Sequence, residues 1–77
     1  MLMSFQAYLN NIKTKTGKEP EDFRKMAEQK GFTKNGKLKT ETKAGDIVQW
    51  LKKDFNLGHG HAMAIYALLK GIKKEGD

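Results

Sequence analysis

Residues 43–72 read KAGDIVQWLKKDFNLGHGHAMAIYALLKGI, and this stretch decides the fold. Its first half repeats apolar side chains at helical spacing, which predicts an amphipathic helix over 43–55 at the centre of the core. A glycine-containing break, Asn56 to Gly60, ends that helix. A second helix is predicted over 61–71, because apolar residues cover a wide arc of it: Ala62, Ile65, Tyr66, Leu68 and Leu69.

Two more helices are predicted upstream of this pair. Ser4 precedes apolar residues at positions i, i+3, i+4 and i+7, so it is the expected N-cap of a helix over 4–16 that Gly17 ends. Pro20 suits the first turn of another helix, over 20–30, and Gly31 supplies its end. These signals place two amphipathic helices in the first part of the chain.

The segments between and after the helices are expected to be irregular. Residues 32–42 form a lysine-rich connecting loop, in which Asn35-Gly36 is a turn signal but the flanking apolar residues are too few to define two strands. Thr40 or Thr42 is the expected cap of the helix that follows. The charged tail, 73–77, is expected to fray.

Length and composition indicate one small basic domain. A chain of 77 residues suffices for one core and not for two, so 1–77 is predicted to be a single all-α domain, a small bundle of about four short helices. The 15 Lys plus Arg exceed the 9 Asp plus Glu, and this net charge of +6 favours an anionic partner such as nucleic acid. All basic residues except Arg24 are lysines, which are less suited to bidentate recognition of bases or phosphates.

Neither a secretory signal nor a membrane-spanning helix is expected. The start, Met1 to Ser4, lacks the basic region, apolar stretch and cleavage site of a secretory signal. The longest apolar run, 62–69, is far below the ~20 residues that cross a bilayer as a helix. The chain has no Cys, which fits a reducing compartment. A cytoplasmic protein is therefore predicted.

The stretch 57–64, Leu-Gly-His-Gly-His-Ala-Met-Ala, is the most distinctive motif, and it has three chemical interpretations. In the first, His59 and His61 share a metal ion with Asp54. A stable site usually needs three or four ligands, and the sequence supplies no further His or Cys, so no metal or other cofactor is predicted. The second, a nucleotide-binding glycine loop, is excluded because no strand precedes it and Met63 stands where a third glycine belongs.

The third interpretation is a helix-hairpin-helix element. Gly58-His59-Gly60 followed by Ala64 resembles the Gly-hydrophobic-Gly turn of many non-specific DNA-binding hairpins, although a histidine here replaces the apolar residue. In such a turn the glycines let the backbone approach a phosphate, and amides at the start of the second helix donate to it. A structural alternative stays open, in which the glycines only permit a tight turn with positive φ and the alanines only permit close helix packing.

Lysines and aromatic residues supply the other candidates for binding. The lysines of the central loop could follow a phosphate backbone, or they could simply keep a solvated loop soluble: Lys34, Lys37, Lys39 and Lys43. Trp50 and Tyr66 could stack on bases, although aromatic residues on helix stripes more often belong to a core. No nucleophile stands beside a base, and no carboxylate pair suggests an active-site cleft, so an enzyme is not predicted.

Four blocks of the sequence, taken in order, resemble a known bacterial family. They lie in 4–9, 15–23, 43–51 and 57–65, and the Gly-His-Gly-His-Ala-Met-Ala segment is the most specific of them. The resemblance is to the family catalogued as domain of unknown function 4287, and it runs from about Ser4 to Gly71. It implies a compact helical bacterial domain that occurs alone or beside other domains, and it carries no established activity, ligand or catalytic residue.

These features predict a small basic binding module without catalytic activity, which contacts nucleic acid through the turn from Gly58 to Ala64 and the nearby lysines. The alternative is a protein-interaction or homo-oligomerising domain. In that case the wide apolar arc of helix 61–71 is only partly covered within one chain, and its burial is completed by a protein partner or a second copy.

Overall fold

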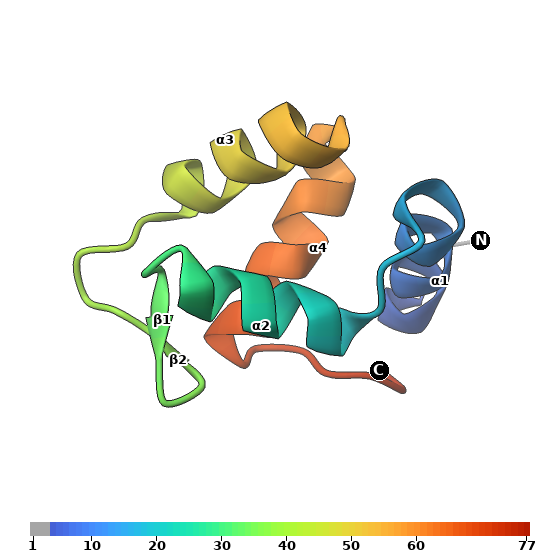
Figure 1. The fold of residues 1–77 in the computed structure, drawn as a ribbon. Coiled ribbons are helices and arrows are strands. Elements are labelled where there is room, and N and C mark those ends of the chain that lie inside the picture. The colour runs from blue at the N-terminus through green and yellow to red at the C-terminus, as the bar shows by residue number, and fades with distance from the viewer. Residues whose placement is uncertain (1–3) are drawn as a thin grey trace.

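A computed structural model describes residues 4–77 of the protein, and helices predominate in it (Figure 1). Within these residues the elements follow in chain order as α1 (Phe5–Thr16), α2 (Pro20–Gln29), β1 (Thr33–Lys34), β2 (Lys37–Leu38), α3 (Ala44–Phe55) and α4 (His59–Lys70). The two strands form a small antiparallel hairpin. The prediction of a small, mainly α-helical fold with four short helices is confirmed.

Helix α4 lies at the centre of the fold, in contact with α1, α2, α3 and β2 (Figure 1). Its apolar arc explains this position, because five of its residues are buried: Ala62, Ala64, Ile65, Leu68 and Leu69. Helix α3 packs against α4 and adds the buried side chains of Ile47, Trp50 and Leu51. The central helix is therefore α4, and not the preceding helix as the sequence pattern suggested.

The helix ends follow the local sequence at most of the predicted positions. The hydroxyl of Ser4 accepts a hydrogen bond from the amide of Ala7 at 3.1 Å, as expected of an N-cap. Gly17 and Gly71 adopt left-handed φ values of 75° and 83° just after α1 and α4, conformations that glycine adopts without steric cost. These signals are short-range, so the sequence alone revealed them.

The predicted threonine cap of α3 is wrong. Lys43 is the N-cap residue, and its amide donates to a carboxylate oxygen of Asp46 at 3.0 Å. Thr42 instead donates its hydroxyl to the carbonyl of Phe32 at 3.0 Å, which ties the end of the connecting loop back to its start. The same amide-to-carboxylate contact begins α2, where Glu19 donates to Asp22 at 2.8 Å.

The segment predicted as an irregular loop contains the β1–β2 hairpin. Asn35 and Gly36 both have positive φ, 56° and 78°, which is the requirement of a two-residue type I′ turn. The strands pair in the register Thr33 with Leu38 and Lys34 with Lys37. Two residues per strand are enough here because Thr33 is buried and Leu38 packs against the core, so the strands are stabilised by tertiary burial without a long alternating apolar pattern.

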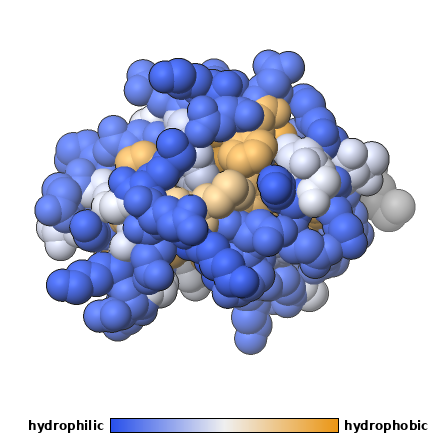
Figure 2. All heavy atoms as spheres, in the orientation of Figure 1, coloured by the Kyte–Doolittle hydropathy of each residue, from blue (hydrophilic) through white to orange (hydrophobic). Residues whose placement is uncertain are grey.

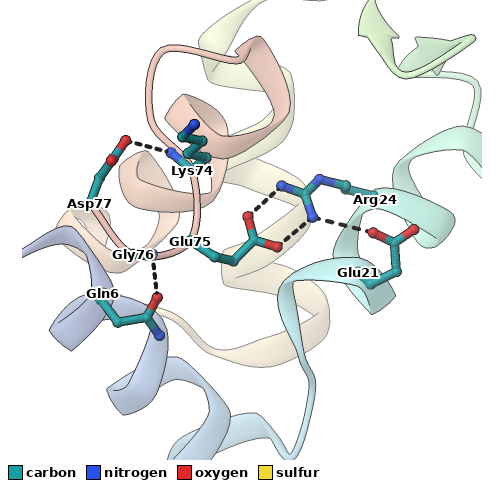
Figure 3. Close-up of polar contacts among 7 residues, drawn as sticks. All are labelled: Gln6, Glu21, Arg24, Lys74, Glu75, Gly76 and Asp77. Atoms are coloured by element: carbon teal, nitrogen blue, oxygen red, sulfur yellow. Dashed lines mark hydrogen bonds and ion pairs between the residues drawn. The ribbon is translucent and has the colours of Figure 1, made fainter.

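The C-terminal tail, predicted to fray, is instead tied to α1 and α2 (Figure 3). The carboxylate of Glu75 accepts two hydrogen bonds from the Arg24 guanidinium, both at 2.7 Å. The amide of Gly76 donates to the side-chain carbonyl of Gln6 at 2.8 Å. The prediction failed because the anchoring partners lie more than fifty residues away in the chain.

Most of the apolar arc of α4 is covered within one chain. Among residues 4–77 the only large hydrophobic side chain that is exposed is Ile72, at 62 %. On the face drawn in Figure 2, apolar residues show as a patch near the middle, between α2 and α3, and as a smaller patch to its left, both surrounded by hydrophilic residues. Among the described residues, therefore, little remains uncovered of the arc on which the protein-partner alternative depended, namely the partly exposed Tyr66 and the exposed Ile72 beyond the helix. None of their helices has the length and apolar character needed to cross a membrane.

Candidate nucleic-acid interface

The turn between α3 and α4 differs from its predicted form. The left-handed residue is Asn56, at φ 54°, whereas Gly58 is the N-cap of α4 with φ −69°, and Gly60 is helical. Helix α4 therefore begins at His59, two residues earlier than predicted. The expectation that the glycines provide positive φ is wrong, because Asn56 supplies the reversal of the chain direction.

The N-terminus of α4 presents unpaired backbone donors. The Gly58 carbonyl accepts the first hydrogen bond of the helix, from the amide of Ala62 at 2.9 Å. The three amides of residues 59–61 therefore have no acceptor within the helix. Gly58 has no side chain to cap them, and the first turn contains no acidic residue. Gly58, His59 and Gly60 are exposed. This end therefore has the partial positive charge and free donors that favour an anion.

The two histidines of this turn have different surroundings. His59 is exposed, whereas His61 is partly buried and packs edge-on against Tyr8 of α1, with ring centroids 5.7 Å apart. Asp54, the third residue considered for a metal, forms an ion pair with Lys30 at 3.3 Å. Across residues 4–77 no three His, Cys, Asp or Glu side chains gather as a metal site would need.

The lysines of the central segment lie at the other end of α4. Lys37 and Lys39 line a groove of about 560 Å³ between the hairpin and the C-terminal half of that helix, together with Lys70. We call this the basic groove; its other lining side chains include Thr40, Thr42 and Tyr66. A second, adjoining groove of about 430 Å³ adds Lys34 and contains Glu41. Lys43 lines neither groove.

Lys70 is the functional candidate that sequence reasoning missed. It stands more than thirty residues after Lys37 and Lys39, in the last turn of α4, where a lysine is also explained by the helix dipole. Its ammonium donates to the hydroxyl of Tyr66 at 3.3 Å. Only the packing of the hairpin against α4 brings these residues to one groove, so no local signal in the sequence could have grouped them.

The charge of the basic groove is not neutralised within the described residues. No carboxylate side chain is among the residues that line it. The ion pairs found among residues 4–77 involve other basic residues, namely Lys13, Arg24 and Lys30. Three lysines thus line one groove that has no lining carboxylate, an arrangement that favours an anionic ligand.

The predicted site is therefore two sites at opposite ends of α4. The glycine turn precedes its first residue, and the basic groove includes its last turn and Gly71. Twelve helical residues separate the ends by about 18 Å. The structure brings Lys37 and Lys39 together with Lys70, and it does not bring them to Gly58 and His59.

Comparison with known proteins identifies the family to which this chain belongs. Searches of curated proteins and of solved structures found no match. The sequence model of one family, described as Domain of unknown function (DUF4287), matches residues 4–71. That range includes the glycine turn and the basic groove, and it excludes Glu75 and Gly76 of the tail. Because the match covers most of the length of this chain, the chain belongs to the DUF4287 family.

Proposed function

We propose that this protein is a non-enzymatic module that binds nucleic acid through its phosphates, with the basic groove as the principal contact. The observation that carries the proposal is the meeting of Lys37, Lys39 and Lys70, from two segments distant in the chain, in a groove without a lining carboxylate. Neutralising phosphates with lysines releases counterions, which drives binding to any sequence. A cytoplasmic location and a bacterial origin stay predictions that accompany this proposal.

The chemistry of the groove favours binding that is independent of base sequence. Lysine acts as a mobile point charge, whereas bidentate recognition of a base edge or a phosphate is the property of arginine. The only arginine, Arg24, lies outside the basic groove and is engaged by Glu75 and Glu21. The proposed contact is therefore with the nucleic-acid backbone.

The N-terminus of α4 is a second contact in this proposal. A Cβ atom added at Gly58 or Gly60 would meet no other atom within 4 Å, and neither residue needs positive φ. Internal packing therefore does not require glycine at these positions, whereas close approach by an external phosphate would favour it. At a rise of about 3.4 Å per nucleotide of duplex, the length of α4 corresponds to roughly five nucleotides.

The test measures how affinity depends on salt. Fluorescence anisotropy of a labelled oligonucleotide gives the dissociation constant between low and near-physiological salt, for a DNA duplex and for a single-stranded RNA. Three neutralised phosphates predict a slope of log K against log salt of about −2 for a single strand. Each of Lys37→Gln, Lys39→Gln and Lys70→Gln should reduce the magnitude of that slope by about 0.7.

Lys52→Gln is the matched control, because Lys52 is an exposed lysine of α3 that does not line the basic groove. It should leave the slope nearly unchanged relative to the groove variants. The proposal is contradicted if binding is insensitive to salt, or if the triple groove variant binds like the wild type. Circular dichroism of each variant checks that the helical content is retained.

A further inference from the structure

Trp50 and Tyr66 are the two aromatic residues that the sequence offers for stacking on a nucleic-acid base, and they differ in exposure. Trp50 is buried, only 6 % exposed, and its ring lies 5.6 Å from that of Phe32 and 6.3 Å from that of Phe55. Tyr66 is partly buried and lines the basic groove. Of the two, only Tyr66 presents surface to a ligand in that groove.

The ammonium of Lys70 lies at one end of the Tyr66 ring. Its Nζ is 3.3 Å from the hydroxyl oxygen and 5.6 Å from the ring centroid, so it sits toward the hydroxyl and not above the middle of the ring. A cation held at this edge can bind a phosphate without covering the aromatic surface. The groove thus combines a positive edge with an aromatic ring.

The size of the groove limits which form of nucleic acid can use that ring. Its volume of about 560 Å³ is in the range of sites that hold one small ligand. Bases within a duplex are stacked on their neighbours and present only their edges in the grooves, so an aromatic ring reaches a base face only where the base is unpaired. A charged groove with an aromatic platform is the common arrangement of proteins that bind single strands.

We infer that the basic groove accepts an unpaired nucleotide, whose base stacks on Tyr66 while its phosphates lie among Lys37, Lys39 and Lys70. This inference rests on the proposed function and deepens it, because it names single-stranded nucleic acid as the ligand class. It also assigns a specific part to the ring of Tyr66, which phosphate binding alone does not require.

The experiment compares the full chain with an oligothymidine single strand and with a duplex of equal length, at one salt concentration. The single strand is expected to bind at least tenfold more tightly. Loss of a stacked base predicts that Tyr66→Leu weakens single-strand binding by about five- to hundredfold and leaves duplex binding unchanged. Tyr66→Phe, which keeps the ring, should stay within about twofold of the wild type. Phe5→Leu, at a partly buried aromatic residue of α1 that does not line the basic groove, is the matched control and should leave both affinities unchanged.

A second readout uses the wild-type protein and does not depend on a variant that folds. Ring-current shielding by a stacked base should move the NMR signals of the Tyr66 ring protons upfield on addition of oligothymidine, and inorganic polyphosphate should not. Equal affinity for single strand and duplex, or Tyr66 signals that respond identically to both additives, overturns the inference. If lysine variants still weaken binding in that case, the proposed function stands; if no nucleic acid binds at all, the proposed function itself fails.

Discussion

Replacing Glu75 by Gln tests whether the C-terminal tail contributes to the stability of the fold. In the wild type the Glu75 carboxylate accepts two hydrogen bonds at 2.7 Å from Arg24, and the neighbouring Gly76 binds Gln6 (Figure 3). The substitution keeps the shape of the side chain and removes its charge. It therefore isolates the electrostatic part of the attachment of the tail to α2.

The magnitude follows from the pKa of Glu75, which the hydrogen-bonded Arg24 guanidinium lowers from 4.5 to about 2. At about 1.4 kcal/mol per pKa unit, this shift corresponds to an upper limit of roughly 3 kcal/mol. The side chains of Glu75 and Arg24 are 45 % and 33 % exposed, so solvent screening reduces the value to about 1 kcal/mol. In a domain of this size such a loss lowers the melting temperature by roughly 4–8 °C.

The direction of the pH dependence follows from the same shift. Because the pKa of Glu75 is lower in the folded protein, its stabilisation is fully present above about pH 4.5 and is lost as the pH falls toward 2. Urea unfolding, followed by the fluorescence of the buried Trp50, should show that Glu75→Gln is destabilised at pH 6. At pH 2 the difference between variant and wild type should largely disappear.

A double-mutant cycle with Arg24→Gln provides the decisive control. Arg24 also contacts Glu21 at 3.2 Å, so the loss from Arg24→Gln alone contains more than the interaction with Glu75. The cycle should give a coupling energy of about 1 kcal/mol at low salt. If Glu75→Gln destabilises the Arg24→Gln background as much as the wild type, the ion pair does not hold the tail and this reasoning is refuted.

Two glycine substitutions should have opposite effects on the free energy of unfolding, measured by urea denaturation. Gly36→Ala should cost about 1–2 kcal/mol, because Gly36 has φ 78° in the hairpin turn; a neutral result would contradict the assigned turn. Gly60→Ala should raise stability by up to about 1 kcal/mol, because Gly60 is helical and a Cβ there has open space. The same Gly60→Ala protein should bind nucleic acid more weakly, and unchanged affinity would remove the N-terminus of α4 from the proposed interface.

The sequence predicted the helices because their signals are local. Apolar spacing identified each amphipathic stripe, and the side chain of Ser4 and the left-handed glycines Gly17 and Gly71 are capping devices recognisable within a few residues. The family resemblance was likewise carried by short ordered blocks, and the family match over 4–71 confirms it. Such features require no knowledge of which helix packs on which.

The features that the sequence did not reveal depend on contacts between distant residues. The hairpin is two residues long on each side and relies on the burial of Thr33 and on Leu38 packing against the core. The attachment of Glu75 to Arg24 and the presence of Lys70 in the basic groove join segments separated by thirty or more residues. The sequence showed the turn signal Asn35-Gly36, but whether strands form on either side of that turn depends on this tertiary packing.

The split of the predicted site has a simple geometric origin. A turn that begins a helix and residues that pack on its far end are separated by the whole rise of that helix, here about 18 Å. Proximity in the sequence between the Lys-rich segment and Gly58 suggested one surface, but α3 carries the chain away before α4 returns it. The lysines therefore share a groove with the end of α4, and the free amides stand alone at its start.

The hairpin connects the fold to the proposed function. Its turn needs two consecutive residues with positive φ, which Asn35 and Gly36 provide. Gly36 itself lines the basic groove, and the strand after the turn places Lys37 in the same groove as Lys70 of α4. A change that disrupts this turn would therefore disturb the spacing of the lysines as well as the stability of the domain. A hairpin of two residues per strand, held by the burial of Thr33 and the packing of Leu38, is in this arrangement the element that brings Lys37 to the groove.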